Sequence, residues 1–262
     1  MRPLTKIHGG KGRLAKPFIV PNLPSGYEQM TYCEPFCGMA SVLLKKNKSK
    51  REILLDEDFL TIYLLSICKS FPSSLYHSLC YMAYNEITFN YYKGQNPIDI
   101  YDQAIKKYVL SRMSRGGLGE TFAWQERLRG GQPGSINEWK TSLDNIWLVS
   151  DRLKDVEIYC QSFEESIPLY DSVDTLFYCD PPYVKSTRSC PNIYNHEMDE
   201  SAHTTLLELL CSIKGKALVS GYSSKLYHDK LKGWNRVEKI VANNSGQNAK
   251  KQLRTEVLWM NY

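Results

Sequence analysis

The tetrapeptide Asp180-Pro181-Pro182-Tyr183 directly follows an apolar, aromatic run at residues 176–179. Such a run is typical of a buried strand, so the tetrapeptide lies at a strand's carboxyl end, where open α/β sheets bind their ligands. Consecutive prolines lack N–H donors and hold their carbonyl oxygens stiffly. With the Asp180 carboxylate they form a rigid pair of acceptors beside the aromatic face of Tyr183. This pattern predicts a site for the exocyclic amine of a flat heterocycle, with the nitrogen lone pair directed at an electrophile; the alternative is a plain proline turn.

A second group of residues predicts a nucleoside site. Residues 34–38 follow another short predicted strand, and we expect them to open a helix whose N–H groups attract a polar or carboxylate group. Gly38 allows the backbone to approach a ligand closely, and Phe36 is suited to contact an adenine or ribose. About 20 residues further on, Asp56 ends the next predicted strand, a position from which acidic residues bind ribose hydroxyls.

Two further polar segments are less specific. Residues 160–163 end the strand before the tetrapeptide's strand; on their own they are a polar turn, but Ser162 and Phe163 are placed to frame an adenine ring. Residues 6–13 are basic and rich in glycine, yet lack the GxxxxGK[ST] spacing of a phosphate-binding loop. We interpret His8 within them as an ordinary loop histidine.

These segments need a scaffold of alternating strands and helices. The expected strands are residues 30–33, 52–55, 156–159, 175–179 and 216–220, the expected helices are 40–46, 59–69 and 200–213, and a closing antiparallel pair is 234–241 with 256–260, joined by a polar loop at 242–253. This order predicts an α/β fold with a doubly wound, Rossmann-like mixed sheet.

The alternation stops between residues 71 and 150. That stretch contains predicted helical segments at 76–89 and 100–112, followed by a basic, glycine-rich run. We therefore expect a catalytic domain formed by residues 1–70 and 151–262, with a mainly helical subdomain inserted at 71–150.

Composition narrows the class of protein. The 262 residues are 42% hydrophobic, enough for a full core, and no apolar stretch has the length of a membrane helix. The N-terminal residues lack the hydrophobic region of a signal peptide, which predicts a cytoplasmic protein. The eight cysteines lack paired CxxC spacing, and Cys33 with Cys37 has no nearby histidine, so we expect reduced thiols and no metal. A net charge of +5 is compatible with nucleic acid binding without requiring it.

The ordered motifs KIHGGK, EPFCG, LLDED, CQSF and DPPY resemble the DNA adenine methylase family, the D12 class of N6 adenine-specific DNA methyltransferases. The segments SRGGLGETFAW, YNHEM and RTEVLW resemble the phage and prophage branch in particular. The resemblance implies a fold that binds S-adenosylmethionine and a target-recognition role for the insertion. The residues it implies for the cofactor are Lys11, Glu34, Pro35, Phe36, Cys37, Gly38, Asp56, Ser162, Phe163 and Asp180.

The function expected from motifs and resemblance together is methyl transfer from S-adenosylmethionine to N6 of an adenine flipped out of duplex DNA. The tetrapeptide at residues 180–183 would be catalytic, with no metal or protein nucleophile. We expect a monomer or weak dimer, without an obligatory protein partner or membrane contact, in the cytoplasm of a bacterial or phage-infected cell. The alternatives are methylation of cytosine N4, of RNA or of a protein glutamine, and a catalytically silent DNA-binding relative.

The insertion also supplies candidate DNA contacts. Arg112 and Arg115 are close in sequence to Gly116, Gly117 and Gly119, which can turn tightly, and arginine suits bidentate contact with guanine. We expect Arg127 and Arg129 to contact phosphate, and Lys6 near the N-terminus to join them. The alternative is that these are solvated surface charges.

Overall fold

The structure, a computed structural model, describes residues 1–7, 9–184, 197–242 and 253–262. It consists of two compact units, which we call the helical unit and the sheet unit. The helical unit comprises Met1–Gly12, Gly38–Leu44 and Phe59–Val156, and the sheet unit comprises Arg13–Cys37, Lys45–Asp58 and Glu157–Tyr262. No helix among the described residues is long and apolar enough to cross a bilayer.

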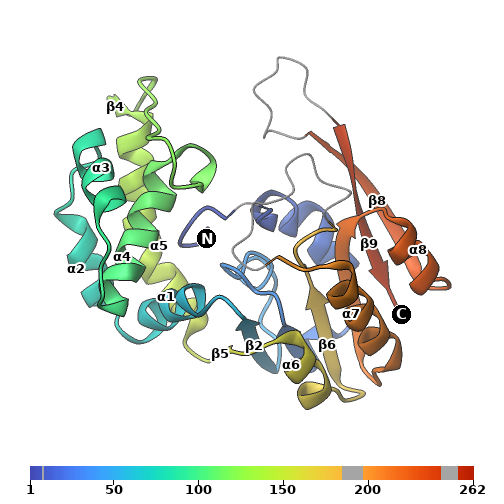
Figure 1. The fold of residues 1–262 in the computed structure, drawn as a ribbon. Coiled ribbons are helices and arrows are strands. Elements are labelled where there is room, and N and C mark those ends of the chain that lie inside the picture. The colour runs from blue at the N-terminus through green and yellow to red at the C-terminus, as the bar shows by residue number, and fades with distance from the viewer. Residues whose placement is uncertain (8, 185–196, 243–252) are drawn as a thin grey trace. The chain divides into compact units, whose positions relative to one another are not determined.

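The sheet unit is built on a seven-stranded sheet, counted over the described residues (Figure 1). Its strands are β1 (Thr31–Glu34), β2 (Arg51–Asp56), β5 (Glu157–Cys160), β6 (Thr175–Cys179), β7 (Lys216–Tyr222), β8 (Asn235–Ala242) and β9 (Leu253–Met260). They are ordered β5-β2-β1-β6-β7-β9-β8, with the first five parallel and β9 antiparallel to both neighbours. The chain order reverses between β1 and β6, which is the topological switch point of a doubly wound sheet. The predicted Rossmann-like mixed α/β sheet is therefore confirmed.

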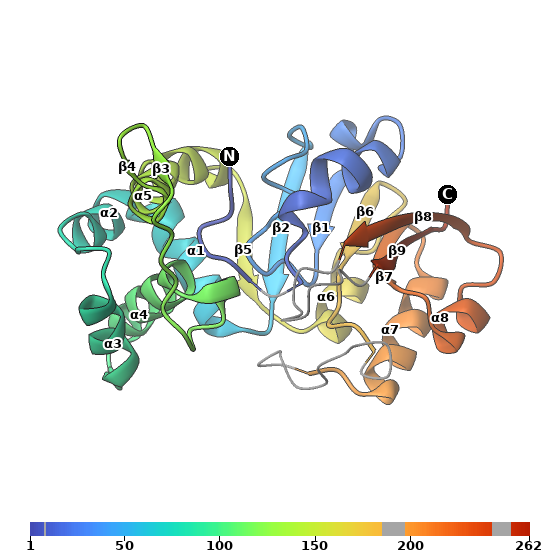
Figure 2. The same ribbon diagram turned by 90° about the horizontal axis from the view of Figure 1, so that it is seen from above.

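One face of this sheet carries the main apolar core. Alternate side chains such as Cys33, Phe177 and Val219 pack with residues of α6 (Phe163–Tyr170), α7 (Glu200–Ser212) and α8 (Lys225–Lys230). Each helix begins at a serine or aspartate whose side chain accepts a backbone N–H three residues on: Ser162, Asp199 and Ser224. Figure 2 shows α6, α7 and α8 on one side of the sheet, and on the other the short helices of residues 15–29.

A buried ion pair lies on the opposite face of the sheet. Lys46 Nζ is 2.5 Å from Glu52 Oε1, and both side chains are almost completely buried. The ammonium also lies 4.0 Å from the ring centroid of Tyr32, and Glu52 accepts a hydrogen bond from the Ser49 backbone N–H at 3.0 Å. These additional contacts offset the cost of removing two charges from water, and they attach residues 46–49 to β2.

The helical unit contains α1 (Phe59–Ser70), α2 (Pro72–Cys80), α3 (Glu86–Gly94), α4 (Ile100–Met113), α5 (Gly134–Leu153) and the short pair β3 (Leu128–Arg129) and β4 (Gln132–Pro133). Residues 76–89 were predicted as one helical segment but form parts of α2 and α3. The break has a local cause, because the Asn85 side chain accepts the Thr88 N–H at 2.8 Å and so starts a new helix. No predicted helix corresponds to α5, whose Ser142 accepts a hydrogen bond from the buried Tyr108 of α4. The target-recognition role of residues 71–150 stays a prediction.

The helix predicted at residues 40–46 is wrong. Those residues form consecutive turns instead. Gly38 and Ala40 have φ angles of +46° and +53°, in the left-handed region that a right-handed helix excludes. The polar loop predicted at 242–253 falls mostly, and His8 entirely, outside the described residues.

The buried ion pair makes a testable contribution to stability. We expect Glu52→Gln to lower the free energy of unfolding by about 3 kcal/mol, since it leaves the Lys46 charge buried without its counterion. The matched control is Glu157→Gln, because Glu157 pairs with Arg51 at 2.6 Å on the half-exposed edge of the same sheet, where the loss should be below about 1 kcal/mol. Urea unfolding measures both, and equal losses would contradict the assignment.

Candidate functional site

The parallel register places four of the predicted segments at one edge of the sheet unit. Asp56 at the end of β2 lies beside Cys160 at the end of β5, and Glu34 at the end of β1 lies beside Leu54. On the other side of β1, Cys33 pairs with Phe177, so β6 and its tetrapeptide end at the same edge. This edge at the switch point is where doubly wound sheets bind ligands.

Asp180 is held in place by a serine of the neighbouring strand. Ser220 Oγ on β7 donates to Asp180 Oδ1 at 2.8 Å and lies 3.1 Å from the Tyr178 hydroxyl. A serine hydroxyl has one proton, so with that proton on Asp180 it accepts from Tyr178. Burial raises the pKa of Tyr178 well above its ordinary value and the Asp180 charge raises it further, so the phenol stays protonated. The carboxylate is therefore oriented by a relay of two hydroxyls.

Tyr183 is fixed at both ends. Its backbone follows the two prolines, its hydroxyl donates to Glu256 Oε1 on β9, and only 7% of the residue is exposed. Its ring packs against the ring of Tyr222 at the end of β7, with centroids 4.6 Å apart and planes at 71°. The phenol remains a donor, because burial raises its pKa well above the usual value and the Asp180 and Glu256 carboxylates add to that effect.

Backbone hydrogen bonds connect the segments proposed to bind the nucleoside, which follow β1 and β5, to the end of β2. The Cys37 N–H donates to the Leu55 carbonyl at 2.9 Å, and the Gln161 N–H donates to the Asp56 carbonyl at 3.3 Å. Asp56 Oδ1 accepts the Asp58 N–H at 3.0 Å, which orients its half-buried carboxylate. Burial raises the pKa of the Cys37 thiol well above its ordinary value, and the Asp56 charge adds to this, so the thiol is neutral.

The aromatic rings beside Asp56 form one wall. Phe36 and Phe163 have ring centroids 5.3 Å apart, tilted by 32°. A purine inserted between two rings needs about 7 Å, so an adenine would lie against this pair rather than inside it. Ser162 starts α6 by accepting the Glu165 N–H at 3.3 Å, and the Glu34 carboxylate is buried and accepts from the Tyr32 hydroxyl. The Asp56 carboxylate suits the ribose of a nucleoside cofactor, and the rings of Phe36 and Phe163 suit its adenine.

Two predicted cofactor residues belong to the helical unit. Lys11 is 5% exposed and its Nζ donates to the Gly9 carbonyl at 2.9 Å. Gly38 has a φ of +46°, and a Cβ added there would lie 3.6 Å from the Ile7 side chain. Their roles toward the cofactor stay predictions.

Arg112 has a structural position that disfavours its predicted contact with DNA. It is 7% exposed, its Nε donates to the Leu4 carbonyl at 2.6 Å, and a second guanidinium N–H donates to the Pro3 carbonyl. The guanidinium therefore holds the N-terminal segment. The burial of Arg112 could have been predicted from helical spacing, because Arg112 lies one turn after the buried Tyr108 and on the same face of the helix.

Arg115 and Arg127 are exposed, as a contact with DNA requires, and Arg129 lies on β3. The N-terminal segment lies next to the glycine-rich run, because a Cβ at Gly117 (φ +80°) would come within 2.6 Å of the Lys6 carbonyl oxygen. The side chain of Lys6 forms an ion pair with Glu138 at 3.2 Å. Only glycine permits this approach, and it brings two predicted DNA-binding segments together.

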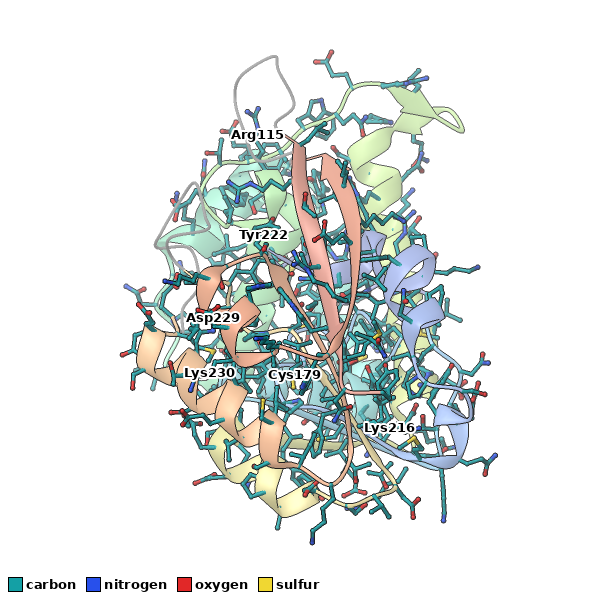
Figure 3. The ribbon with its side chains drawn as sticks, turned by 90° about the vertical axis from the view of Figure 1, so that its right-hand side faces the viewer. Arg115, Cys179, Lys216, Tyr222, Asp229 and Lys230 are labelled. Atoms are coloured by element: carbon teal, nitrogen blue, oxygen red, sulfur yellow. The ribbon has the colours of Figure 1, made fainter. Side chains whose placement is uncertain are left out.

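The site residues predicted from the sequence do not include Ser220, Tyr222 or Glu256. Lys216 and Tyr222, labelled in Figure 3, mark the two ends of β7, and Tyr222 is the cross-strand partner of Glu256 on β9. The available signal was a glutamate directly before the apolar run at residues 257–260, because buried carboxylates require partners.

Comparison with known proteins identifies the family. The D12 class N6 adenine-specific DNA methyltransferase profile matches residues 8–243. No curated protein is significantly similar to the chain.

Three solved structures show weak similarity. An rRNA methyltransferase from Streptomyces viridochromogenes has 15% identity, coverage of 95% of this chain and 84% of that one, and a TM-score of 0.44. A precorrin 8W decarboxylase from Methanobacterium thermoautotrophicum has 8% identity, coverage of 89% and 81%, and a TM-score of 0.35. An rRNA methylase from Streptococcus thermophilus has 8% identity, coverage of 94% of both chains and a TM-score of 0.32. Similarity at this level supports no assignment of function, whereas the profile spans most of the chain. The chain therefore belongs to the D12 class of N6 adenine-specific DNA methyltransferases, a family of enzymes.

Proposed function

We propose that this enzyme transfers a methyl group from S-adenosylmethionine to N6 of an adenine flipped out of duplex DNA. The observation that carries the proposal is the Asp180 carboxylate, oriented by Ser220 and followed by two rigid prolines at the switch-point edge of the sheet. A flipped base costs a few kcal/mol of stacking and pairing, which contacts at this edge would offset.

The residues present fit a nucleoside cofactor. Asp56 would bind the ribose hydroxyls, and the wall of Phe36 and Phe163 would contact the adenine. The other residues that we assign to the same cofactor, from the resemblance of the sequence motifs, are Lys11, Glu34, Pro35, Cys37, Gly38, Ser162 and Asp180. When bound, S-adenosylmethionine supplies a methyl group on a sulfonium, which is already a good leaving group.

Asp180 and the Pro181 carbonyl would each accept one N–H of the target amine. These two hydrogen bonds draw the nitrogen lone pair out of conjugation and aim it along the line of transfer. The Asp180 carboxylate would also stabilise the positive charge on the nitrogen until the methylated amine releases one of its two protons and becomes neutral N6-methyladenine. Tyr183, with Pro182 holding its backbone, offers a fixed ring against which the base can pack.

The proposed DNA contacts are Lys6, Arg115, Arg127 and Arg129, with Arg115 reading a base and the others contacting phosphate. Arg112 is removed from this set because its guanidinium is bonded to Pro3 and Leu4. We propose a monomer or weak dimer that works in the cytoplasm of a bacterial or phage-infected cell.

The product tests the proposed reaction. Plasmid DNA from cells expressing the protein should contain N6-methyladenine that is missing from cells with the empty vector, as measured by mass spectrometry of hydrolysed DNA. Finding N4-methylcytosine in its place would show that the enzyme methylates the amine of cytosine. Finding no modified base at all would contradict the proposal.

Asp180→Ala should lower the rate of methyl transfer by about a hundredfold or more, because the amine loses its charged acceptor. The matched control is Asp174→Ala, which removes an exposed aspartate at the opposite end of β6. Single-turnover incorporation of labelled methyl groups measures both variants. A folded Asp180→Ala protein with the wild-type rate would contradict the mechanism.

Asp56→Ala should weaken S-adenosylmethionine binding about tenfold while leaving DNA affinity unchanged, since its proposed partner is the ribose. Calorimetry with the cofactor and a DNA gel shift provide the two affinities. The control is Glu57→Ala, the exposed neighbouring carboxylate. Equal cofactor affinities for both variants would remove Asp56 from the site.

A further inference from the structure

Glu256 is a buried carboxylate that the proposed reaction does not use. It is 3% exposed on β9, where the following residues Val257, Leu258 and Trp259 are all buried and apolar. An apolar side chain at this position would avoid the several kcal/mol that it costs to bury a charge. The carboxylate therefore requires a specific compensating partner.

One such partner is Tyr183, the tyrosine of the tetrapeptide proposed to be catalytic. The Tyr183 hydroxyl donates to Glu256 Oε1, and Glu256 is the cross-strand partner of Tyr222, whose ring packs on Tyr183. Two adjacent antiparallel strands thus provide two different contacts to one ring, a hydrogen bond from β9 and an aromatic contact from β7.

These contacts fix the direction of the Tyr183 ring. The prolines before Tyr183 restrict its backbone, and the hydroxyl bond holds the far end of the ring. Because burial and the charges of Asp180 and Glu256 keep the phenol protonated, it donates throughout the physiological range. A ring ordered before the base arrives loses no rotational freedom on binding.

We propose that Glu256 is the positioning residue of Tyr183, holding its ring at the orientation in which the target adenine packs. The inference rests on the proposed function, since it concerns the base that Tyr183 receives. Glu256 acts on the ring by accepting the hydrogen bond from the Tyr183 hydroxyl. The reaction requires this acceptor oxygen and does not require the negative charge of the glutamate.

The test uses the full chain with Glu256→Ala, Glu256→Gln, Tyr183→Phe and the double variant Glu256→Ala with Tyr183→Phe. Glutamine keeps the acceptor oxygen and removes the charge. The control is Glu238→Ala, a half-exposed glutamate on the adjacent strand β8 that pairs with Arg236. Each variant is measured for the single-turnover rate constant and for cofactor affinity. The proteins that retain Tyr183 are also measured for its ring-flip rate by NMR on tyrosine-labelled protein.

We expect Glu256→Ala and Tyr183→Phe each to lower the rate constant about tenfold. The double variant should be no slower than the slower single variant, because both changes break the same bond. Glu256→Gln should be within about twofold of wild type, cofactor affinity should not change, and the Tyr183 ring should flip faster in Glu256→Ala.

Three results would each overturn the inference. The first is a double variant whose loss of rate is the product of the two single losses, and the second is a Glu256→Gln protein as slow as Glu256→Ala. The third is a Tyr183→Phe protein with the wild-type rate. If Glu256→Ala fails to fold, Glu256→Gln and Tyr183→Phe still decide it. Failure of the proposed function is distinct, because wild-type protein would then leave adenine unmethylated while the ring-flip rates still report whether Glu256 holds the ring.

Discussion

The hydrogen bond from Ser220 to Asp180 is the interaction on which the account of the site depends. A carboxylate at a strand end has free rotation about two bonds, and one acceptor in a rigid pair is useful only if its direction is fixed. Ser220 provides that direction from β7, and Tyr178 holds Ser220 in turn. The parallel pairing of β6 with β7 sets the spacing between all three, so the sheet itself orients the Asp180 carboxylate.

Three carboxylates and three phenols lie on or directly after β1, β6 and β9. Tyr32 donates to Glu34, Tyr178 connects through Ser220 to Asp180, and Tyr183 donates to Glu256. Buried acids of this kind destabilise a fold unless every one has a partner, and phenols are suitable partners because burial and negative neighbours keep them protonated. In the proposed reaction, carboxylates at this position would stabilise the positive charge that develops on the target nitrogen.

The strands and the tetrapeptide were predictable because their signals are local: short apolar runs bounded by turn residues define β1, β2, β6 and β7. The roles of Ser220 and Glu256 were not, because they arise only when β7 pairs with β6 and β9 across long stretches of chain. The helix expected at residues 40–46 does not form, because the left-handed backbone at Gly38 and Ala40 is incompatible with a right-handed helix starting there. The glycine-rich sequence close to Arg112 favoured a contact with DNA, but in the structure its buried guanidinium is bonded to the N-terminal segment.

The most direct measurement is a crystal structure of the enzyme with a non-reactive amine analogue of S-adenosylmethionine and a duplex that carries the methylated sequence found in modified DNA. The account predicts a flipped adenine with N6 about 3 Å from both an Asp180 carboxylate oxygen and the Pro181 carbonyl oxygen, packed against Tyr183. An adenine bound at this edge with N6 outside hydrogen-bond distance of both oxygens would contradict it.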